Sequence, residues 1–225
     1  VTIYILIPFL VIPQLILSGI IVPYDKLNPN VSAPSSIPWY GEIITARWAY
    51  EALAVYQYKE NKFEKDLFPY NKILSTATYK KDYWIKSVKN KLNFVNQHYT
   101  DSTKNKEVER ALILIQTEIK KELEVNNNFA FPDIGLLNIR LFDSTMNMRA
   151  LDYLDKLSSY YINLYNRTNS RKDNIIQHFE DSLGRAYIAM KERHTNRSLT
   201  EFVRNSNSLD RIIEYKNALK QKIDP

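Results

Sequence analysis

The first 22 residues carry no charged side chain, and this apolar run constrains the fold more than any other feature of the sequence. As an α-helix, the run would extend about 33 Å, enough to cross the hydrocarbon core of a bilayer, which is about 30 Å thick. Pro8 and Pro13 lie within the run and Pro23 follows it, and each proline removes a backbone N–H donor. In lipid, the carbonyl groups left without donors need partners from neighbouring protein. Residues 1–23 are therefore predicted to form a transmembrane or re-entrant helical segment that packs among other helices.

Residues 24–62 are predicted to leave the membrane along its surface. The first part, 24–38, is rich in Pro, Ser and Asn, as is typical of an irregular connector. The second part, 39–62, is predicted to be a helix with an aromatic character. Its aromatic residues include Trp39, Tyr40, Trp48, Tyr50, Tyr56 and Tyr58. Trp and Tyr are favoured at the membrane–water interface, so an interfacial or re-entrant helix is expected; a Trp- and Tyr-rich core helix is the alternative.

Residues 63–225 are predicted to form a separate domain of antiparallel helices. A first helix is expected over residues 70–98 and a last one over residues 209–222. Residues 167–174 are polar and are predicted to form a weak break or an exposed helical turn. Because strand signals are almost absent, the chain is assigned to the all-α class, a transmembrane or re-entrant segment followed by an antiparallel helical bundle.

Apolar side chains recur at helical spacing through this domain. In the first helix the expected buried stripe is Ile73, Leu74, Ala77, Trp84, Ile85, Val88, Leu92 and Val95. A second helix, which starts near Asp101, is expected to bury Val108, Leu112, Ile115, Ile119 and Leu123. A third, capped by Asp143 or Ser144, has the expected stripe Met148, Leu151, Leu154, Leu157, Tyr161 and Leu164.

No pattern of catalytic or ligand-binding residues is present in the sequence. The chain lacks Cys, which excludes disulfides and thiol chemistry, and its four glycines cannot build a phosphate-binding P-loop. The three histidines, His98, His178 and His194, form no metal-binding motif. The net charge of +6 is spread along the chain without a basic tract, so nucleic acid is not an expected partner. We therefore expect no catalytic residue, no metal site and no cofactor in these residues.

Two neighbouring segments resemble a known family of membrane proteins. Residues 9–27 contain the run LSGIIVP, in which Ser18 and Gly19 precede aliphatic residues, and residues 37–58 follow it. The second segment contains an R-Y/W-x-F/Y-E-x-L element, made here of Arg47, Trp48, Ala49, Tyr50, Glu51, Ala52 and Leu53. Together the segments are similar to the end of the fifth transmembrane helix and the following re-entrant segment of ABC-2-type permeases. The likeness is to the G subfamily, the white-type and drug- or sterol-exporting transporters.

This resemblance implies an ATP-driven exporter for an amphipathic or lipid-like substrate. An ATP-binding cassette, where ATP and Mg would bind, would precede the membrane domain, and a second subunit, as in a homodimer, would complete the transport path in contact with membrane lipids. By position, Ile20 and Ile21 would form a closing valve, and the path below them would be lined by Ile12, Leu15 and Ile16. A helix broken by Pro and Gly can bend, and β-branched residues can seal a narrow pore by excluding water. The alternative is that these isoleucines face lipid.

The chain departs from this family after the R-Y/W-x-F/Y-E-x-L element. The family has a short, often disulfide-bonded external loop there, whereas about 165 residues without Cys follow here. Residues 63–225 are therefore interpreted as an enlarged periplasmic domain, inserted before a last membrane helix of an inner-membrane protein and able to bind a periplasmic partner. The start at Val1 favours a fragment of a longer protein. A membrane-anchored periplasmic sensor and a soluble helical interaction protein are the alternatives.

Overall fold

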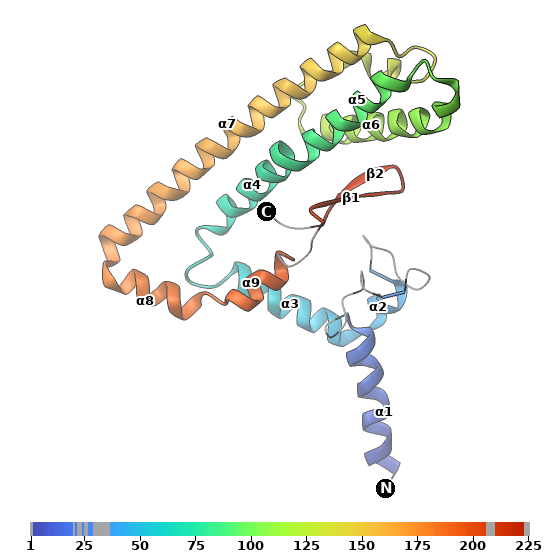
Figure 1. Cartoon of the computed structure of the whole chain (residues 1–225). Helices are drawn as coiled ribbons and strands as arrows, with labels where there is room; N and C mark the ends of the chain where they lie inside the picture. Colours follow the sequence, from blue (N-terminus) through green and yellow to red (C-terminus); the bar gives the residue numbers. More distant parts are fainter. Residues whose placement is uncertain are drawn as a thin grey trace.

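The computed structural model describes residues 2–19, 21, 24, 27–28, 37–205 and 210–222. The chain is mainly helical, as predicted, and includes one small two-stranded sheet (Figure 1). An N-terminal arm comprises the helices α1 (Thr2–Leu17), α2 (Trp39–Ile43) and α3 (Thr45–Lys59). The helical domain adds α4 (Phe68–Thr78), α5 (Ile85–His98), α6 (Asn105–Val125), α7 (Ser144–Leu183), α8 (Arg185–His194) and α9 (Arg197–Val203). The strands are β1 (Ile212–Tyr215) and β2 (Ala218–Gln221).

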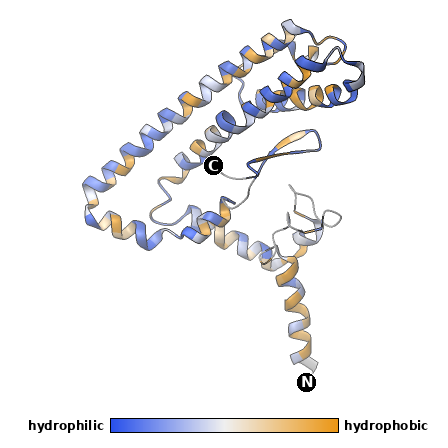
Figure 2. Ribbon diagram, viewed as in Figure 1, coloured by the Kyte–Doolittle hydropathy of each residue, from blue (hydrophilic) through white to orange (hydrophobic). Residues whose placement is uncertain are grey.

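The helix α1 projects away from the helical domain and is mainly apolar (Figures 1 and 2). Its apolar side chains are exposed on all sides, from Tyr4 at 81% to Leu17 at 42%. Among the described residues, no helix has both the length and the apolarity that crossing a membrane requires. The prediction that this segment is helical is confirmed. The helix ends at Leu17, and a turn that contains Ser18 and Gly19 follows it.

The predicted helix over residues 39–62 is divided in two. Ile44 has extended backbone angles, φ −80° and ψ 109°, so α2 ends there and α3 begins at Thr45. The second helix ends at Lys59, and the side-chain carbonyl of Asn61 then accepts hydrogen bonds from the backbone N–H groups of Phe63 and Glu64. The interruption at Ile44 was not visible in the sequence, because neither Gly nor Pro marks it.

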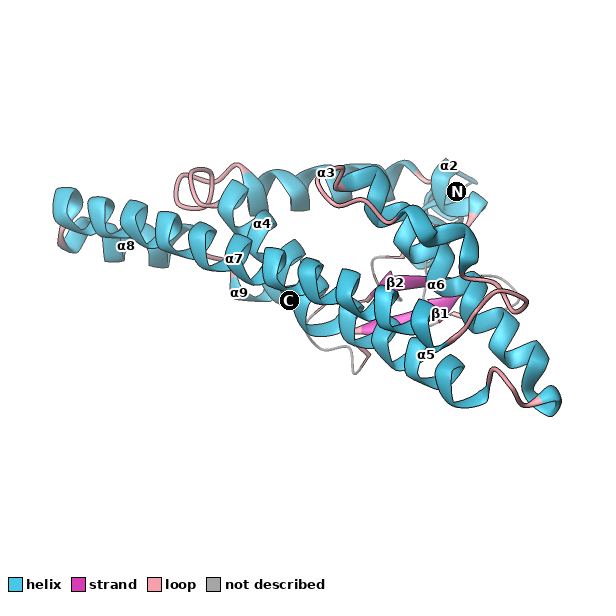
Figure 3. Cartoon of the chain, turned by 90° about the horizontal axis from the view of Figure 1, so that it is seen from above, coloured by secondary structure: helices cyan, strands magenta, loops and turns pink. Residues whose placement is uncertain are grey.

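The helices α4 and α5 are joined end to end by a π-helical turn, Tyr79–Trp84, where one helix over residues 70–98 was predicted. The additional residue of a π turn rotates the faces on either side of it relative to each other. Ile73, predicted as buried, is 39% exposed, whereas Ala77, Trp84 and Leu92 are buried as expected. The helix α7 packs beside α4 and α5, and α6 packs against α5 (Figures 1 and 3).

The buried stripe of α6 is confirmed at Val108, Leu112, Ile115 and Ile119, which are each no more than 1% exposed, whereas Leu123 is only partly buried. The helix α7 begins after Asp143, whose carboxylate accepts the N–H of Met146 at 2.6 Å, as its predicted capping role requires. Its core residues are Ala150, Tyr153, Leu154, Leu157 and Tyr161. Met148, predicted in this stripe, is instead 60% exposed.

Residues 167–174 form a mostly exposed part of a helix, which was one of the two predictions, and not the weak break, because α7 runs without interruption for 40 residues. None of those residues is Gly or Pro, and polar side chains on an exposed face do not disturb a helix. The helix ends instead at Gly184, where φ is +53°. The helices α8 and α9 then lead the chain back to α3 (Figure 1).

The predicted last helix over residues 209–222 is wrong. The described part of this stretch is an antiparallel hairpin in which Tyr215 pairs with Ala218. Its two-residue loop, Lys216 and Asn217, has φ values of +50° and +56°, as a type I′ turn requires. Figure 3 shows the hairpin beside α5 and α6, where Ile212 and Leu219 pack on the core. The stretch was misread as a helix because its apolar residues also fit a helical spacing.

Gly184→Ala is expected to destabilise the helical domain by about 1–3 kcal/mol, because residues with a Cβ rarely adopt its positive φ. A Cβ there would meet no atom within 4 Å, so the loss would come from backbone strain alone. Gly135→Ala is the matched control, since its Cβ would also meet nothing within 4 Å and its φ is not positive. Urea unfolding of both variants, followed by circular dichroism, measures the difference; equal stabilities would contradict this account.

Candidate functional site

The end of α1 is fixed to the rest of the arm by Tyr24. The hydroxyl of Tyr24 donates a hydrogen bond to the carbonyl of Leu17 at 2.9 Å, and Ser18 donates to the carbonyl of Leu15 at 2.8 Å. Gly19 has φ +76°, and a Cβ on it would lie 2.6 Å from the ring of Tyr24. Glycine is therefore needed here both for the backbone angle and for the close approach of the ring.

A second glycine, Gly41 of α2, also lies close to the side chain of Tyr24. A Cβ on Gly41 would lie 2.5 Å from the hydroxyl oxygen of Tyr24, and the ring of Tyr40 meets that of Tyr24 edge to face at 6.2 Å. Burial raises the pKa of Tyr24, with the charge of Arg47 acting in the opposite direction. The phenol therefore remains a neutral donor at physiological pH. The ring of Tyr24 fills the space between the end of α1 and α2.

Arg47 organises the arm from α3. Its side chain is buried, and its Nε donates to the carbonyl of Gly41 at 2.9 Å. The two terminal nitrogens bind carboxylates on either side, Glu42 at 2.9 Å and Glu51 at 2.5 Å. The guanidinium also lies 3.9 Å from the ring centre of Trp48, whose Nε1 donates to the carbonyl of Glu42 at 2.8 Å. A planar guanidinium with five donors can serve all these acceptors, which a lysine could not.

The structure thus brings together most of the residues singled out in the R-Y/W-x-F/Y-E-x-L element. Arg47, Trp48 and Glu51 form one cluster, which Gly41 links to Tyr24 and the turn after α1. Tyr50 lies elsewhere, with its ring edge to face against that of Phe202 in α9, 5.8 Å away.

Four of the five residues predicted to form a valve and its lining lie within the described part of the chain. Ile12, Leu15, Ile16 and Ile21 are exposed, at 53%, 42%, 52% and 63%. Ile20 lies outside the described residues. No closed path lined by these residues is present in the part of the chain that the structure describes.

A second cluster, in the core of the helical domain, was missed by the sequence analysis. Glu122 of α6 is 1% exposed and forms an ion pair with Lys80 of the π-helical turn, with 2.6 Å between Nζ and Oε2. Tyr161 of α7 donates a hydrogen bond to the other oxygen of the same carboxylate. Since an isolated buried carboxylate would be strongly destabilising, these partners fix how three helical segments meet.

Glu118, one turn earlier in α6, is the second member of this cluster. Its carboxylate accepts hydrogen bonds from Nε1 of Trp84 at 2.7 Å and from the backbone N–H of Leu219 in β2 at 3.0 Å. Lys121 forms an ion pair with it at 2.7 Å. Glu118 and Glu122 stand on the same helix face as the apolar residues Ile115 and Ile119. Acidic residues on a predicted buried stripe were the signal that could have revealed the cluster.

The aromatic hydroxyls around Glu122 titrate outside the physiological range. Burial, followed by the charge of Glu122, raises the pKa of Tyr153 to about 12. Burial and the hydrogen bond to Glu122 raise the pKa of Tyr161 further. The hydroxyls of Tyr153 and Tyr161 therefore stay protonated near neutral pH.

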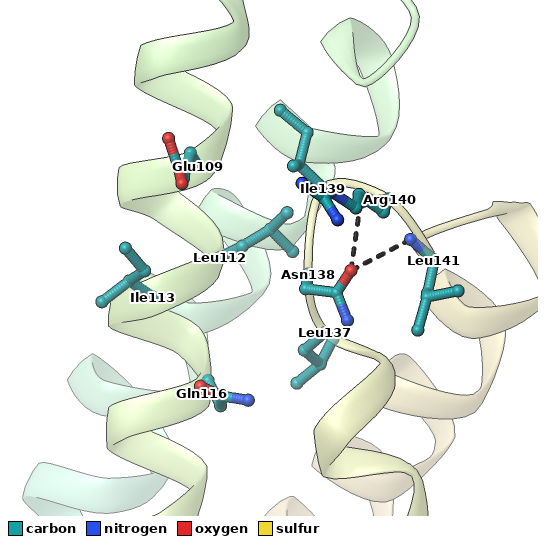
Figure 4. A pocket seen from close by; sticks show the side chains of 9 residues that line it. All are labelled: Glu109, Leu112, Ile113, Gln116, Leu137, Asn138, Ile139, Arg140 and Leu141. Carbon is teal, nitrogen blue, oxygen red and sulfur yellow. Dashed lines mark hydrogen bonds between the residues drawn. The ribbon is translucent and has the colours of Figure 1, made fainter.

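A surface pocket lies between α6 and the segment Leu137–Leu141 (Figure 4). Its volume is about 510 Å³, and Glu109 is the acidic residue among those that line it. The side-chain oxygen of Asn138 accepts hydrogen bonds from the backbone N–H groups of Arg140 and Leu141, at 3.0 and 3.1 Å. This side chain therefore stabilises the loop. Across the described ranges, no group of three His, Cys, Asp or Glu residues is placed to hold a metal ion.

Comparisons with protein-family models, curated proteins and solved structures found no match to this chain. The candidate sites therefore rest on geometry alone: the arm centred on Tyr24 and Arg47, and the buried cluster centred on Glu118 and Glu122.

Tyr161→Phe is expected to destabilise the domain by about 1–3 kcal/mol, because it leaves a buried carboxylate oxygen of Glu122 without its donor. Tyr153→Phe is the matched control. Among the described residues its buried hydroxyl has no hydrogen-bond partner, so removing it should be neutral or slightly stabilising. Urea unfolding at neutral pH measures both, and an equal loss in the two variants would contradict the assignment.

The wild type and Tyr153→Phe should differ in how much stability they lose at high pH. The raised pKa of Tyr153 contributes stability that is complete below its unfolded value of about 10. That contribution is lost as the pH rises through about 12, its value in the folded protein. The wild type should therefore lose more stability than Tyr153→Phe over this range, as measured by urea midpoints.

Proposed function

We propose that the chain is part of the membrane domain of an ATP-driven exporter that moves an amphipathic or lipid-like substrate. In this proposal α1 is the end portion of a membrane helix, the residues through α3 form the re-entrant or interfacial element, and residues 63–225 are an external domain. ATP and Mg would bind to a cassette elsewhere in the protein, and a second subunit would complete the path.

The exposure of α1 is the observation that carries this proposal. Ile5, Phe9 and Ile12 are 67%, 76% and 53% exposed, and the helix has no polar face that could meet water. A helix that is apolar all round is stable only where protein or lipid covers it. Its 16 residues extend about 24 Å, which suits the end portion of a membrane helix. Pro8 and Pro13 within it favour contact with neighbouring helices, which can supply the missing hydrogen bonds.

The arm next to α1 is consistent with a place at a membrane surface. Trp39 and Trp48 are 77% and 51% exposed, and such rings are favoured at the level of lipid headgroups. The Arg47 cluster and Tyr24 join this aromatic element to the end of α1, as expected if the two segments that resemble ABC-2-type permeases act as one unit. Within the proposal, the helical domain serves for partner binding, gating or support of the dimer.

Insertion of α1 into lipid is the first testable consequence. When the full chain is synthesised with phosphatidylethanolamine–phosphatidylglycerol vesicles, it should resist extraction by alkaline carbonate. Ile12→Arg should reduce the resistant fraction several-fold, because a charge near the middle of a membrane helix costs about 2.5–3.5 kcal/mol.

Ile188→Arg in α8 is the matched control. Ile188 is 58% exposed and Ile12 is 53% exposed, so the two changes place the same charge at similarly exposed isoleucines. Ile188→Arg should remain resistant to extraction. Release of the wild-type chain by carbonate, or equal release of both variants, would contradict insertion through α1.

The transport function is tested on the complete gene and its product. The gene should encode an ATP-binding cassette before these residues and a further apolar helix within about 80 residues after them. In the intact protein, Ile20→Ala combined with Ile21→Ala should change substrate-stimulated ATP hydrolysis without lowering expression, whereas unchanged transport would reject the valve. A kinase or methyl-accepting domain after the next apolar helix would overturn the exporter and favour a sensor.

A further inference from the structure

A cavity of about 810 Å³ lies where α3, α4, α7 and α9 meet, next to the end of β2. In Figure 1, α9 lies beside α3, the last helix of the N-terminal arm. The volume lies within the range of about 300–1,000 Å³ that is usual for sites that bind small molecules. None of the residues of the Glu118 and Glu122 cluster lines it, and neither do those of the Arg47 cluster.

The charged residues that line the cavity are mostly basic. They are Lys59, Lys72, Lys172 and Arg204, against the single carboxylate of Glu64. Lys72 and Lys172 form no ion pair within 4 Å among the residues that the structure describes. A cavity lined by an excess of one sign of charge concentrates ligands of the opposite sign.

Glu64 does not neutralise this excess. Its carboxylate accepts a hydrogen bond from Nδ2 of Asn71 at 3.1 Å. Burial raises the pKa of Glu64 even though Lys172 and Arg204 act to lower it. Even a charged Glu64 would offset only one of the four basic side chains, so the lining keeps an excess of positive charge.

The remainder of the lining is apolar or aromatic. It includes Val55, Tyr58, Phe68, Leu74, Tyr165 and Val203. The ammonium of Lys59 lies 5.6 Å from the ring centre of Phe68, so a positive charge stands beside the apolar lining. A ligand that fits these surfaces combines an anionic group with a hydrocarbon portion.

We propose that this cavity binds an anionic amphiphile, whose phosphate or carboxylate group is held by Lys72, Lys172 and Arg204 and whose hydrocarbon portion lies against the apolar lining. Lysine and arginine are suited to phosphate, the first as a point charge and the second through paired donors. The proposal depends on the cavity of the helical domain and stands whether or not the chain belongs to an exporter.

Calorimetric titration of the full chain in phosphatidylcholine nanodiscs tests the proposal. The probe is hexyl phosphate, compared with neutral hexyl glucoside and with inorganic phosphate, each corrected with empty nanodiscs. Hexyl phosphate should bind at least about tenfold more tightly than either of the others, since it alone satisfies both parts of the lining. Binding of hexyl glucoside with equal affinity would overturn the need for an anion, and equal binding of inorganic phosphate would overturn the need for a hydrocarbon portion.

Variants locate the binding in the cavity. Lys72→Gln combined with Lys172→Gln should weaken hexyl phosphate binding at least about tenfold, and each single change should weaken it less. The matched control is Lys86→Gln combined with Lys120→Gln, which removes the same charge at exposed positions outside the cavity. Circular dichroism checks that each variant is folded. Should the double variant fail to fold, the single changes decide; unchanged affinity in the folded cavity variants, or an equal loss in the control, would overturn the site.

Discussion

Two buried carboxylates on one face of α6 determine how the helical domain is assembled. Glu122 requires Lys80 and Tyr161, and Glu118 requires Trp84 and the backbone of β2. Hydrophobic contacts alone would allow the helices to slide along one another with little change in buried area, because such contacts have no directional preference. Hydrogen bonds to buried charges do have a directional preference, so each partner must lie at a defined position along the axis of α6. The π-helical turn belongs to this arrangement, since both Lys80 and Trp84 are part of it.

The N-terminal arm and the helical domain place their apolar side chains in opposite ways. In the domain, Leu112 and Leu154 lie inside and charged residues cover the surface, whereas in α1 the apolar side chains point outward. The connection between α1 and the rest of the arm is narrow: one tyrosine ring lies between two glycines, and one arginine lies between two glutamates. A contact of this kind can hold an angle between two parts of a chain without burying a large area. In the proposed function, this contact would lie where the chain passes from lipid to water.

The sequence predicted those features that depend on neighbours along the chain. The helical spacing located the stripe of α6, and the short polar side chain of Asp143 located the start of α7, because both signals act within a few residues. Features that depend on distant partners were missed. The hairpin near the C-terminal end is such a case, because Leu219 is held by a carboxylate 101 residues earlier in the chain. The helix interruption at Ile44 and the π-helical turn were likewise missed, because no local residue type indicates either of them.

The candidate sites also differ in whether they depend on neighbours along the chain or on distant partners. Arg47, Trp48 and Glu51 lie within one helix, so their clustering could be anticipated from their spacing alone. The cavity beside Lys72 and Lys172 could not, because its walls come from four helices whose mutual positions no short-range rule fixes.

The π-helical turn has a consequence for how chain length can vary in this fold. Removing one residue from Tyr79–Trp84 would restore a regular α-helix, but it would rotate α4 relative to α5 by about 100°. Ala77 would then leave the core, or Trp84 would leave Glu118, so a single deletion could not be absorbed by local adjustment. An exposed loop elsewhere in the chain would tolerate the deletion of one residue. Within this one turn, the packing on both sides fixes the number of residues as well as the identity of Lys80 and Trp84.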